Sequence, residues 1–272
     1  MSKLVWDAVG EHYYETGVDH GVLYVQNSSG AYPEGVAWNG LTAVNENPSG
    51  GDEQAIYADN IKYLSLRSAE EFGATIEAYT YPDEWAACDG SAEPVGGVLL
   101  AQQVRAKFGF CYRTKIGNDT NFDDYGYKLH LVYNASANPS SKNYETINDT
   151  PAAITFSWDI TTTPVEVTGT SYKPTAHIVI DKSKLDNTGL GYLADLENVL
   201  YGIDAPEFSA TSTYSVGDYV THETKVYKCT TAITTAAAWD ATKWTEVTKV
   251  GPYLPLPNEV LSIFNYSSSS PS

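Results

Sequence analysis

Short segments in which apolar and polar side chains alternate dominate this chain. In residues 107–116, every second side chain from Phe108 to Ile116 is aromatic, Thr or Ile, and Arg113 and Lys115 lie between them. A period of two places such side chains on opposite faces of a strand, so the segment is predicted to be a half-buried β-strand. The same pattern predicts strands at residues 21–26, 75–81, 127–133, 154–160 and 176–180.

Turn-forming clusters separate these strands. Gly, Pro, Asn and Asp are concentrated at residues 45–52, 116–124 and 137–141, where we expect turns or loops. The sequence therefore predicts a mainly β fold, either a β-sandwich or a barrel, in which loop-sized connections join the strands.

A helical spacing is found in two places. Residues 191–200 carry an apolar stripe and precede Gly202, which predicts a flanking α-helix that ends there. The stripe consists of Leu193, Leu196, Val199 and Leu200. A short second helix is expected at residues 258–264, with Asn258 as its N-cap.

The chain is expected to contain one discontinuous domain and an insert. Residues 206–248 are rich in Thr, Ala and aromatic residues, and apolar chain of the main body resumes after them. We therefore predict a body of residues 1–205 and 249–266, a small inserted β module at 206–248, and an unstructured Ser-rich tail at 267–272.

Charge narrows the range of functions. The 272 residues contain 16 Lys and Arg against 34 Asp and Glu, a net charge of −18, and most of this excess lies in the body. Nucleic-acid binding depends on clustered cations, so the composition argues against a protein that holds DNA. No apolar run is long enough for a membrane span, and early acids argue against a secretory signal. Cys88, Cys111 and Cys229 form no disulfide framework, which indicates synthesis in a reducing compartment.

No catalytic or metal-binding motif is found. The five histidines show no metal spacing: His12 and His20 are expected to pair with nearby acids, whereas His130 and His177 are expected to be hydrogen-bonded sheet residues. The sequence Asp119-x-Asn121-x-Asp123 begins like a calcium loop, but Asp and His stand where that loop needs Gly and Glu. We expect neither an enzyme nor a cofactor.

The insert carries a pattern of its own. Tyr214, Gly217, Asp218 and Val220 are followed by Tyr227, by the pair Trp239-Asp240, and by Trp244. These residues resemble the small chitin-binding-type carbohydrate-binding module of bacterial chitinases, which also occurs on phage tail proteins. The enzyme-borne modules have adjacent exposed tryptophans after the second strand, where this chain has a Thr- and Ala-rich run, residues 230–238.

Roles within the insert are predicted residue by residue. We expect Tyr219 and Trp239 to form an exposed aromatic platform, because sugar rings stack on flat aromatic faces. The module core is predicted to contain Tyr214, Gly217, Asp218, Tyr227 and Trp244. Two interpretations stay open: the module binds a glycan, or it is decoration with buried aromatic residues.

Five segments of the body carry a further resemblance, residues 38–53, 54–64, 71–83, 107–113 and 254–261. Together they resemble the major tail (tail tube) protein of long-tailed phages of Gram-positive bacteria, and this resemblance covers about residues 4–204 and 252–264. It implies hexameric rings, stacked into a tube through which DNA passes without being held, in a virion made in the host cytoplasm. Tape-measure, tail-terminator and baseplate proteins are the further partners that it implies, and no membrane is expected.

The segment 45–60 is predicted to reach a neighbouring ring; it is polar and Gly-rich at first, with Ile56 and Tyr57 near its end. The loop residues expected to make the contact between rings are Asn45, Pro48, Gly50, Gly51 and Asp52. The competing hypotheses are a secreted glycan-degrading enzyme that carries a binding module, and a free-standing adhesin.

Overall fold

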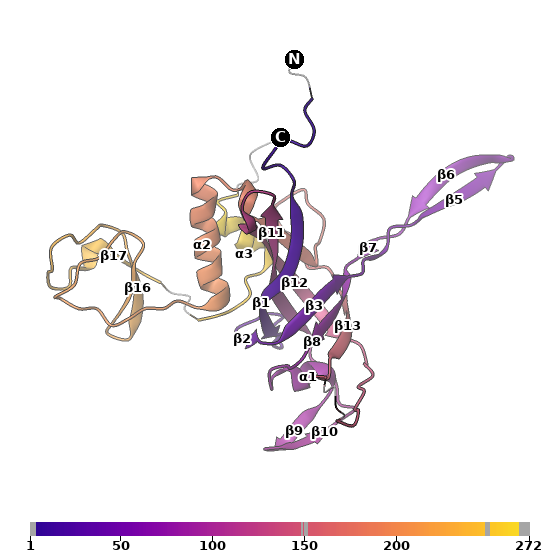
Figure 1. Ribbon diagram of the computed structural model, residues 1–272, viewed down its shortest axis with the longest axis horizontal. Coiled ribbons are helices and arrows are strands. Elements are labelled where there is room, and N and C mark those ends of the chain that lie inside the picture. Colours follow the sequence, from indigo (N-terminus) through magenta and orange to yellow (C-terminus); the bar gives the residue numbers. More distant parts are fainter. Residues whose placement is uncertain (1–3, 148, 150–151, 248–250, 267–272) are drawn as a thin grey trace.

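The computed structural model describes residues 4–147, 149, 152–247 and 251–266. Its main element is an antiparallel sheet in the order β2-β1-β11-β12-β13-β8-β3, with β14 also paired to β12 (Figure 1). The strands are β1 (Tyr14–Val25), β2 (Gly35–Trp38), β3 (Leu41–Glu46), β8 (Gly73–Ala78), β11 (Phe108–Asn118), β12 (Phe122–Ala137), β13 (Phe156–Thr162) and β14 (His177–Asp181). The predicted mainly β fold with a flanking helix is confirmed.

The sheet coils so that its two ends approach each other. Gly21 of β1 lies against Leu41 of β3, and a Cβ at Gly21 would come within 2.2 Å of the Leu41 side chain. The concave side encloses a core in which Trp38, Trp85 and Trp158 pack at centroid distances of 4.7 to 5.7 Å. Trp85 comes from the short helix α1 (Trp85–Asp89). Large aromatic side chains fill this interior.

The convex side carries a second core beneath two helices. Leu129 and Leu131 of β12 pack with Leu193, Leu196 and Leu200 of α2 (Asn187–Tyr201). A buried hydrogen bond joins the sheet to α2: the hydroxyl of Tyr24 in β1 donates to the carbonyl of Leu200 over 2.6 Å. Alternation along the strands thus supplies one apolar face to each core.

The helix that becomes α2 ends before Gly202 as predicted, but the N-terminal ends of both predicted helices differ from those observed. The side chain of Asp186 accepts from the amide of Gly189 and caps α2, so this helix begins before residue 191. The last helix, α3 (Pro257–Ile263), has Leu256 at its N-cap position and Pro257 in its first turn. Asn258 is therefore not the cap, and its side chain donates to Thr168 instead.

Two hairpins project from the body. The first, here called the arm, runs from β4 (Ser49–Gly50) through β5 (Glu53–Ala58) and β6 (Ile61–Arg67) to β7 (Glu70–Glu71). Figure 1 shows it extending far from the sheet. The second consists of β9 (Ala92–Val95) and β10 (Val98–Leu100). The turn predicted at 45–52 is wrong in part, because β3 extends to Glu46 and β4 begins at Ser49.

The turn predicted between β11 and β12 is longer than the observed one. The turn predicted at 116–124 is confined to residues 119–121, because backbone pairing continues to Asn118 and Phe122. Short 3₁₀ turns occupy residues 182–184 and 241–243. No helix in the described part of the chain is long and apolar enough to cross a membrane.

The inserted segment forms a separate three-stranded sheet. Its strands are β15 (Tyr219–His222), β16 (Lys225–Cys229) and β17 (Trp244–Glu246), and they enclose their own small core of Val220, Cys229, Ile233 and Trp244. In Figure 1 it lies beside α2. The predicted boundary at 248/249 and the predicted tail at 267–272 lie outside the described residues.

Candidate glycan-binding module and assembly surfaces

The first turn of the insert depends on Gly217 and Asp218. Gly217 has φ of +99°, a left-handed conformation that glycine adopts without a Cβ penalty, and its amide donates to the carbonyl of Cys229 over 2.8 Å. The carboxylate of Asp218 accepts from the amide of Ser215 over 2.7 Å. The two residues therefore fix the turn that leads into β15.

Aromatic rings fill most of the module. Trp244 is 6% exposed, and the ring of Tyr214 meets it edge to face at 5.2 Å. The hydroxyl of Tyr214 also contacts the backbone of Ser209, accepting from its amide and donating to its carbonyl. Tyr227 packs against the same cluster. The predicted core residues thus lie in or against this core, or in the turn beside it.

Tyr219 faces the body of the protein. Its hydroxyl donates to the carboxylate of Asp195 over 3.3 Å and accepts from the side chain of Asn198 over 3.2 Å, and both partners are on α2. Lys228 lies over the Tyr219 ring and donates to Asp195. Tyr219 is half-buried and helps to hold the module against α2.

Trp239 belongs to the aromatic cluster. Its ring stacks on His222 at 4.0 Å and on Trp244 at 5.2 Å, and the rings of Phe208 and Tyr227 meet it edge-on. The exposed platform of Tyr219 and Trp239 is therefore corrected: both side chains are half-buried, because other groups already use their rings. A glycan-binding role for either residue stays a prediction.

The arm carries a large uncovered apolar surface. Its six exposed large side chains lie on strands that pair only with each other, and Tyr63 is 68% exposed. They are Ile56, Tyr57, Ile61, Tyr63, Leu64 and Leu66. Monomeric proteins rarely expose large apolar side chains together in one patch. The second hairpin adds Val95, Val98, Leu99 and Leu100, all exposed.

Polar contacts keep the arm itself ordered. Glu53 accepts hydrogen bonds from Lys62, Ser65 and Arg67 across the hairpin, and these bonds hold the pKa of its carboxyl below the usual range. Asp52 directly precedes Glu53, at the start of this hairpin.

The predicted inter-ring residues lie where the arm leaves the body. Asn45 is still in β3 and donates to Glu77 over 3.2 Å, and Pro48 precedes β4. Gly50 and Gly51 have φ of +76° and +72°. Gly50 also lies so close to the backbone of Ala69 that a Cβ would come within 2.3 Å of that carbonyl.

Other polar residues singled out in the sequence have structural partners. Asp119 accepts from the amide of Gly10 over 3.0 Å and contacts the His12 ring over 3.2 Å, so it holds the N-terminal segment. His20 contacts Asp19 over 2.9 Å. The three cysteines are free and buried, and burial raises the pKa of the Cys88 and Cys111 thiols to about 12. His130 and His177 meet each other and Glu46, a proximity that sequence spacing did not indicate.

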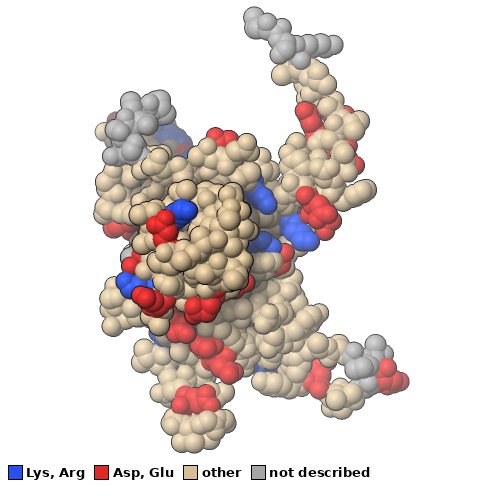
Figure 2. Space-filling model, turned by 90° about the vertical axis from the view of Figure 1, so that its left-hand side faces the viewer, with Lys and Arg blue, Asp and Glu red and all other residues tan. Residues whose placement is uncertain are grey.

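Acidic side chains are spread over the face that carries the module. Figure 2 shows carboxylates distributed over this face, with basic groups in small sets among them. This agrees with the net charge of −18 and with the absence of a like-charged block in the sequence.

Comparison with known families identifies the insert. Residues 207–246 match the model of carbohydrate-binding module family 5/12, and this span contains β15, β16 and β17. The insert is a carbohydrate-binding module. No curated protein matches the chain. The family match covers only the module and does not extend to the body.

Proposed function

We propose that this protein is a structural, non-catalytic subunit of a phage tail tube, and that its carbohydrate-binding module faces outward to contact host cell-wall glycan. The observation that carries the proposal is the arm, an ordered hairpin with six exposed large apolar side chains. Neighbouring copies of the same chain are the partners that would cover it.

The energy available to such a contact is substantial. Burying a large apolar side chain contributes about 1.5–3 kcal/mol, so covering six of them supplies on the order of 10 kcal/mol before the cost of association. A head-to-tail contact whose rotation closes gives a ring, and arms that reach the next ring give a stack. The resemblance of the body to major tail proteins supports six copies in each ring.

The positions of the arm and the module support an outward module. Figure 1 shows them at opposite ends of the longest axis of the chain, with the sheet between them. A subunit whose arm reaches a neighbouring ring can therefore keep its module away from that contact. The acidic composition also suits a conduit, because a basic wall would hold DNA through counterion release.

Electron microscopy of the purified chain tests assembly. We expect rings or tubes, and a triple variant with Tyr57, Tyr63 and Leu66 replaced by Ser should remain a folded monomer. A matched control replaces the exposed Val216 of the module by Ser and should assemble normally. A wild-type chain that stays monomeric at high concentration contradicts the tube, and glycan retention by that monomer would favour an adhesin.

Glycan binding needs its own test. Tubes with and without residues 206–248 are compared for retention on purified host cell-wall polysaccharide. Weak sites repeated along a tube act together, so intact tubes should be retained far better than isolated subunits. Equal retention of both kinds of tube would remove the binding claim and leave the tube proposal standing.

A further inference from the structure

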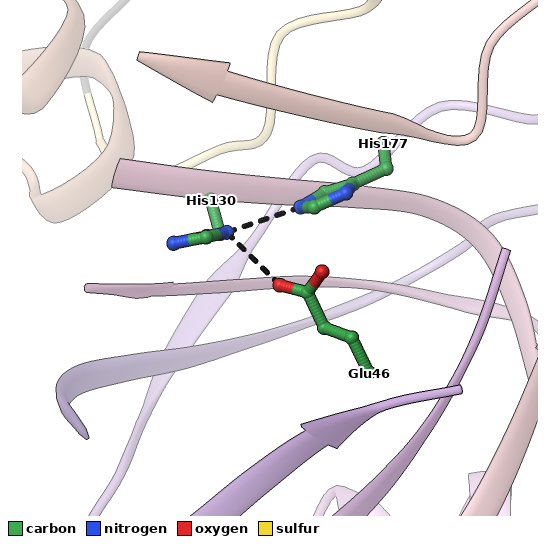
Figure 3. Close-up of side chains that lie close together, drawn as sticks. All are labelled: Glu46, His130 and His177. Atoms are coloured by element: carbon green, nitrogen blue, oxygen red, sulfur yellow. Dashed lines mark hydrogen bonds and ion pairs between the residues drawn. The ribbon is translucent and has the colours of Figure 1, made fainter. Parts of the chain in front are cut away.

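Three side chains that can ligate a metal meet where the arm leaves the sheet. Glu46 is the last residue of β3, His130 lies within β12, and His177 is the first residue of β14. Figure 3 shows the Nδ1 atom of His130 facing both of the others. It lies 3.2 Å from Nε2 of His177 and 3.4 Å from a carboxylate oxygen of Glu46.

Strand register brings the three together. His130 pairs with Val179, so His177, two residues earlier, is its diagonal neighbour on the same face of the sheet. On the other side His130 pairs with Tyr112, whose hydroxyl donates to the Glu46 carboxylate over 2.7 Å. Neither contact depends on local sequence, which explains why spacing along the chain gave no metal motif.

One nitrogen atom, Nδ1 of His130, faces two other potential ligand atoms in this arrangement. Nε2 of His130 lies 3.0 Å from the Thr114 hydroxyl, and in the tautomer that donates there, Nδ1 presents a lone pair. A lone pair that faces a carboxylate oxygen is repelled unless a proton or a cation lies between them. One proton on His177 satisfies one of the two contacts, whereas a cation satisfies all three groups at once.

The separations fit a tetrahedral ion. Zinc binds His nitrogen and carboxylate oxygen at about 2.0–2.2 Å, which sets ligand-to-ligand edges of roughly 3.3–3.5 Å. The two edges at His130, 3.2 Å and 3.4 Å, lie within 0.1 Å of this range. The ligand atoms all lie within 4.8 Å of one another, and the Glu46 side chain is 40% exposed, which leaves it room to close the remaining edge.

Neighbouring side chains orient the three ligands and cover the site. Thr114 and Tyr112 act as outer partners that orient His130 and Glu46. The ring of Phe72, 4.2 Å from that of His177, covers the site from the returning end of the arm.

We infer that Glu46, His130 and His177 bind one divalent transition-metal ion, Zn²⁺ in the first place, with water in the fourth position. Two imidazoles and one carboxylate suit Zn²⁺, whereas Mg²⁺ and Ca²⁺ prefer ligand sets made of oxygen atoms. The ion would join the root of the arm to β12 and β14, and so fix the direction in which the arm leaves the body. The inference does not rest on the tail-tube proposal.

Titration of the chelator-treated full chain with Zn²⁺ and with Co²⁺ tests this site. We expect one equivalent per chain, a higher unfolding temperature with metal, and the intense visible absorption of tetrahedral Co²⁺. The variants His177→Ala and Glu46→Gln should bind at least about 100-fold more weakly, given that loss of outer partners alone costs 10–100-fold. Circular dichroism checks that both fold.

A matched control uses the histidine of the module. His222→Ala removes an imidazole that lies outside the cluster and should leave Zn²⁺ affinity and the Co²⁺ spectrum unchanged. Uptake of less than one equivalent by the wild-type chain overturns the inference. Equal affinity in the wild-type and His177→Ala chains overturns it as well.

Discussion

The backbone amide of Tyr253 donates to the carbonyl of Val199 over 3.0 Å, although the whole carbohydrate-binding module lies between them in the sequence. Gly202 also lies close to Pro252, so the chain leaves and re-enters the body at nearly the same point. An insert with adjacent ends adds little loop-closure entropy, about 0.6 kcal/mol per doubling of its length.

Excision of the module should therefore leave the body folded. We expect a chain with residues 206–248 replaced by a short Gly-Ser linker to keep the near-ultraviolet circular dichroism of the body and nearly the same unfolding temperature. A control excision that also removes residues 251–254 deletes the Tyr253 amide and the Leu254 side chain of the convex core, and should unfold at lower temperature. Equal stability of the two excised chains would contradict this account.

Trp244 should be required for the fold of the module. Truncation of a buried Trp costs about 3–5 kcal/mol, which is a large part of the free energy of unfolding of so small a domain. We expect Trp244→Ala to make residues 206–247 sensitive to protease while the body stays resistant. The exposed Val216→Ala variant is the matched control and should show wild-type cleavage. A protease-resistant W244A module would show that the core is organised differently.

Tyr219 should attach the module to α2. The variant Tyr219→Phe keeps the ring and loses the hydrogen bonds to Asp195 and Asn198. Each lost hydrogen bond should weaken the attachment of the module by about 0.5–1.5 kcal/mol. We expect faster hydrogen exchange and cleavage at the links between module and body, and an unchanged module core. The converse variant, Tyr214→Phe, loses bonds to Ser209 within the module and should leave those links protected.

Gly50 should control the direction of the arm. Gly50→Val places a β-branched side chain at φ of +76° and against the Ala69 carbonyl, so the base of the arm must change conformation. The predicted result is a folded monomer that assembles poorly, as for deletion of Pro48–Asp52. Size-exclusion chromatography and electron microscopy measure both variants. Normal-length tubes from the deletion would rule out the arm as the contact between rings.

The ion pair of Asp19 and Arg113 should contribute to stability in a defined pH range. Partial burial raises the pKa of Asp19, but the Arg113 guanidinium 3.0 Å away and the His20 ring together outweigh it, and the net pKa is lowered. A carboxyl with a lowered folded pKa stabilises above its unfolded pKa, near 3.8, and this stability is lost as the pH falls through the folded pKa.

Replacing Asp19 by Asn isolates this effect. Above pH 5 the D19N chain should be less stable than wild type by no more than about 1 kcal/mol, because the pair is partly exposed. The difference should shrink as the pH falls below 4, since protonated Asp19 no longer attracts Arg113. Urea unfolding from pH 2.5 to 6 measures it, and a constant difference over this range would contradict the assignment.

The sequence by itself determined the elements whose signals are local. Alternation in residues 107–116 identified most of β11, the apolar stripe before Gly202 identified most of α2, and Gly217-Asp218 located the first turn of the module. These features follow from side-chain periodicity and from the few residues that tolerate particular backbone angles. The identity of the insert also followed from local spacing, as the family match to residues 207–246 confirms.

Only the tertiary structure decided which distant residues meet. The sequence predicted only the polar, Gly-rich start of the arm. The hairpin that follows was not predicted, because its two strands pair with each other and their exposed apolar side chains do not mark a buried face. Tyr219 was expected in solvent, but the position of α2 brings Asp195 against it. Glu46, His130 and His177 come together through the register of three strands, and register is set by pairing across the whole sheet, which no stretch of sequence encodes alone.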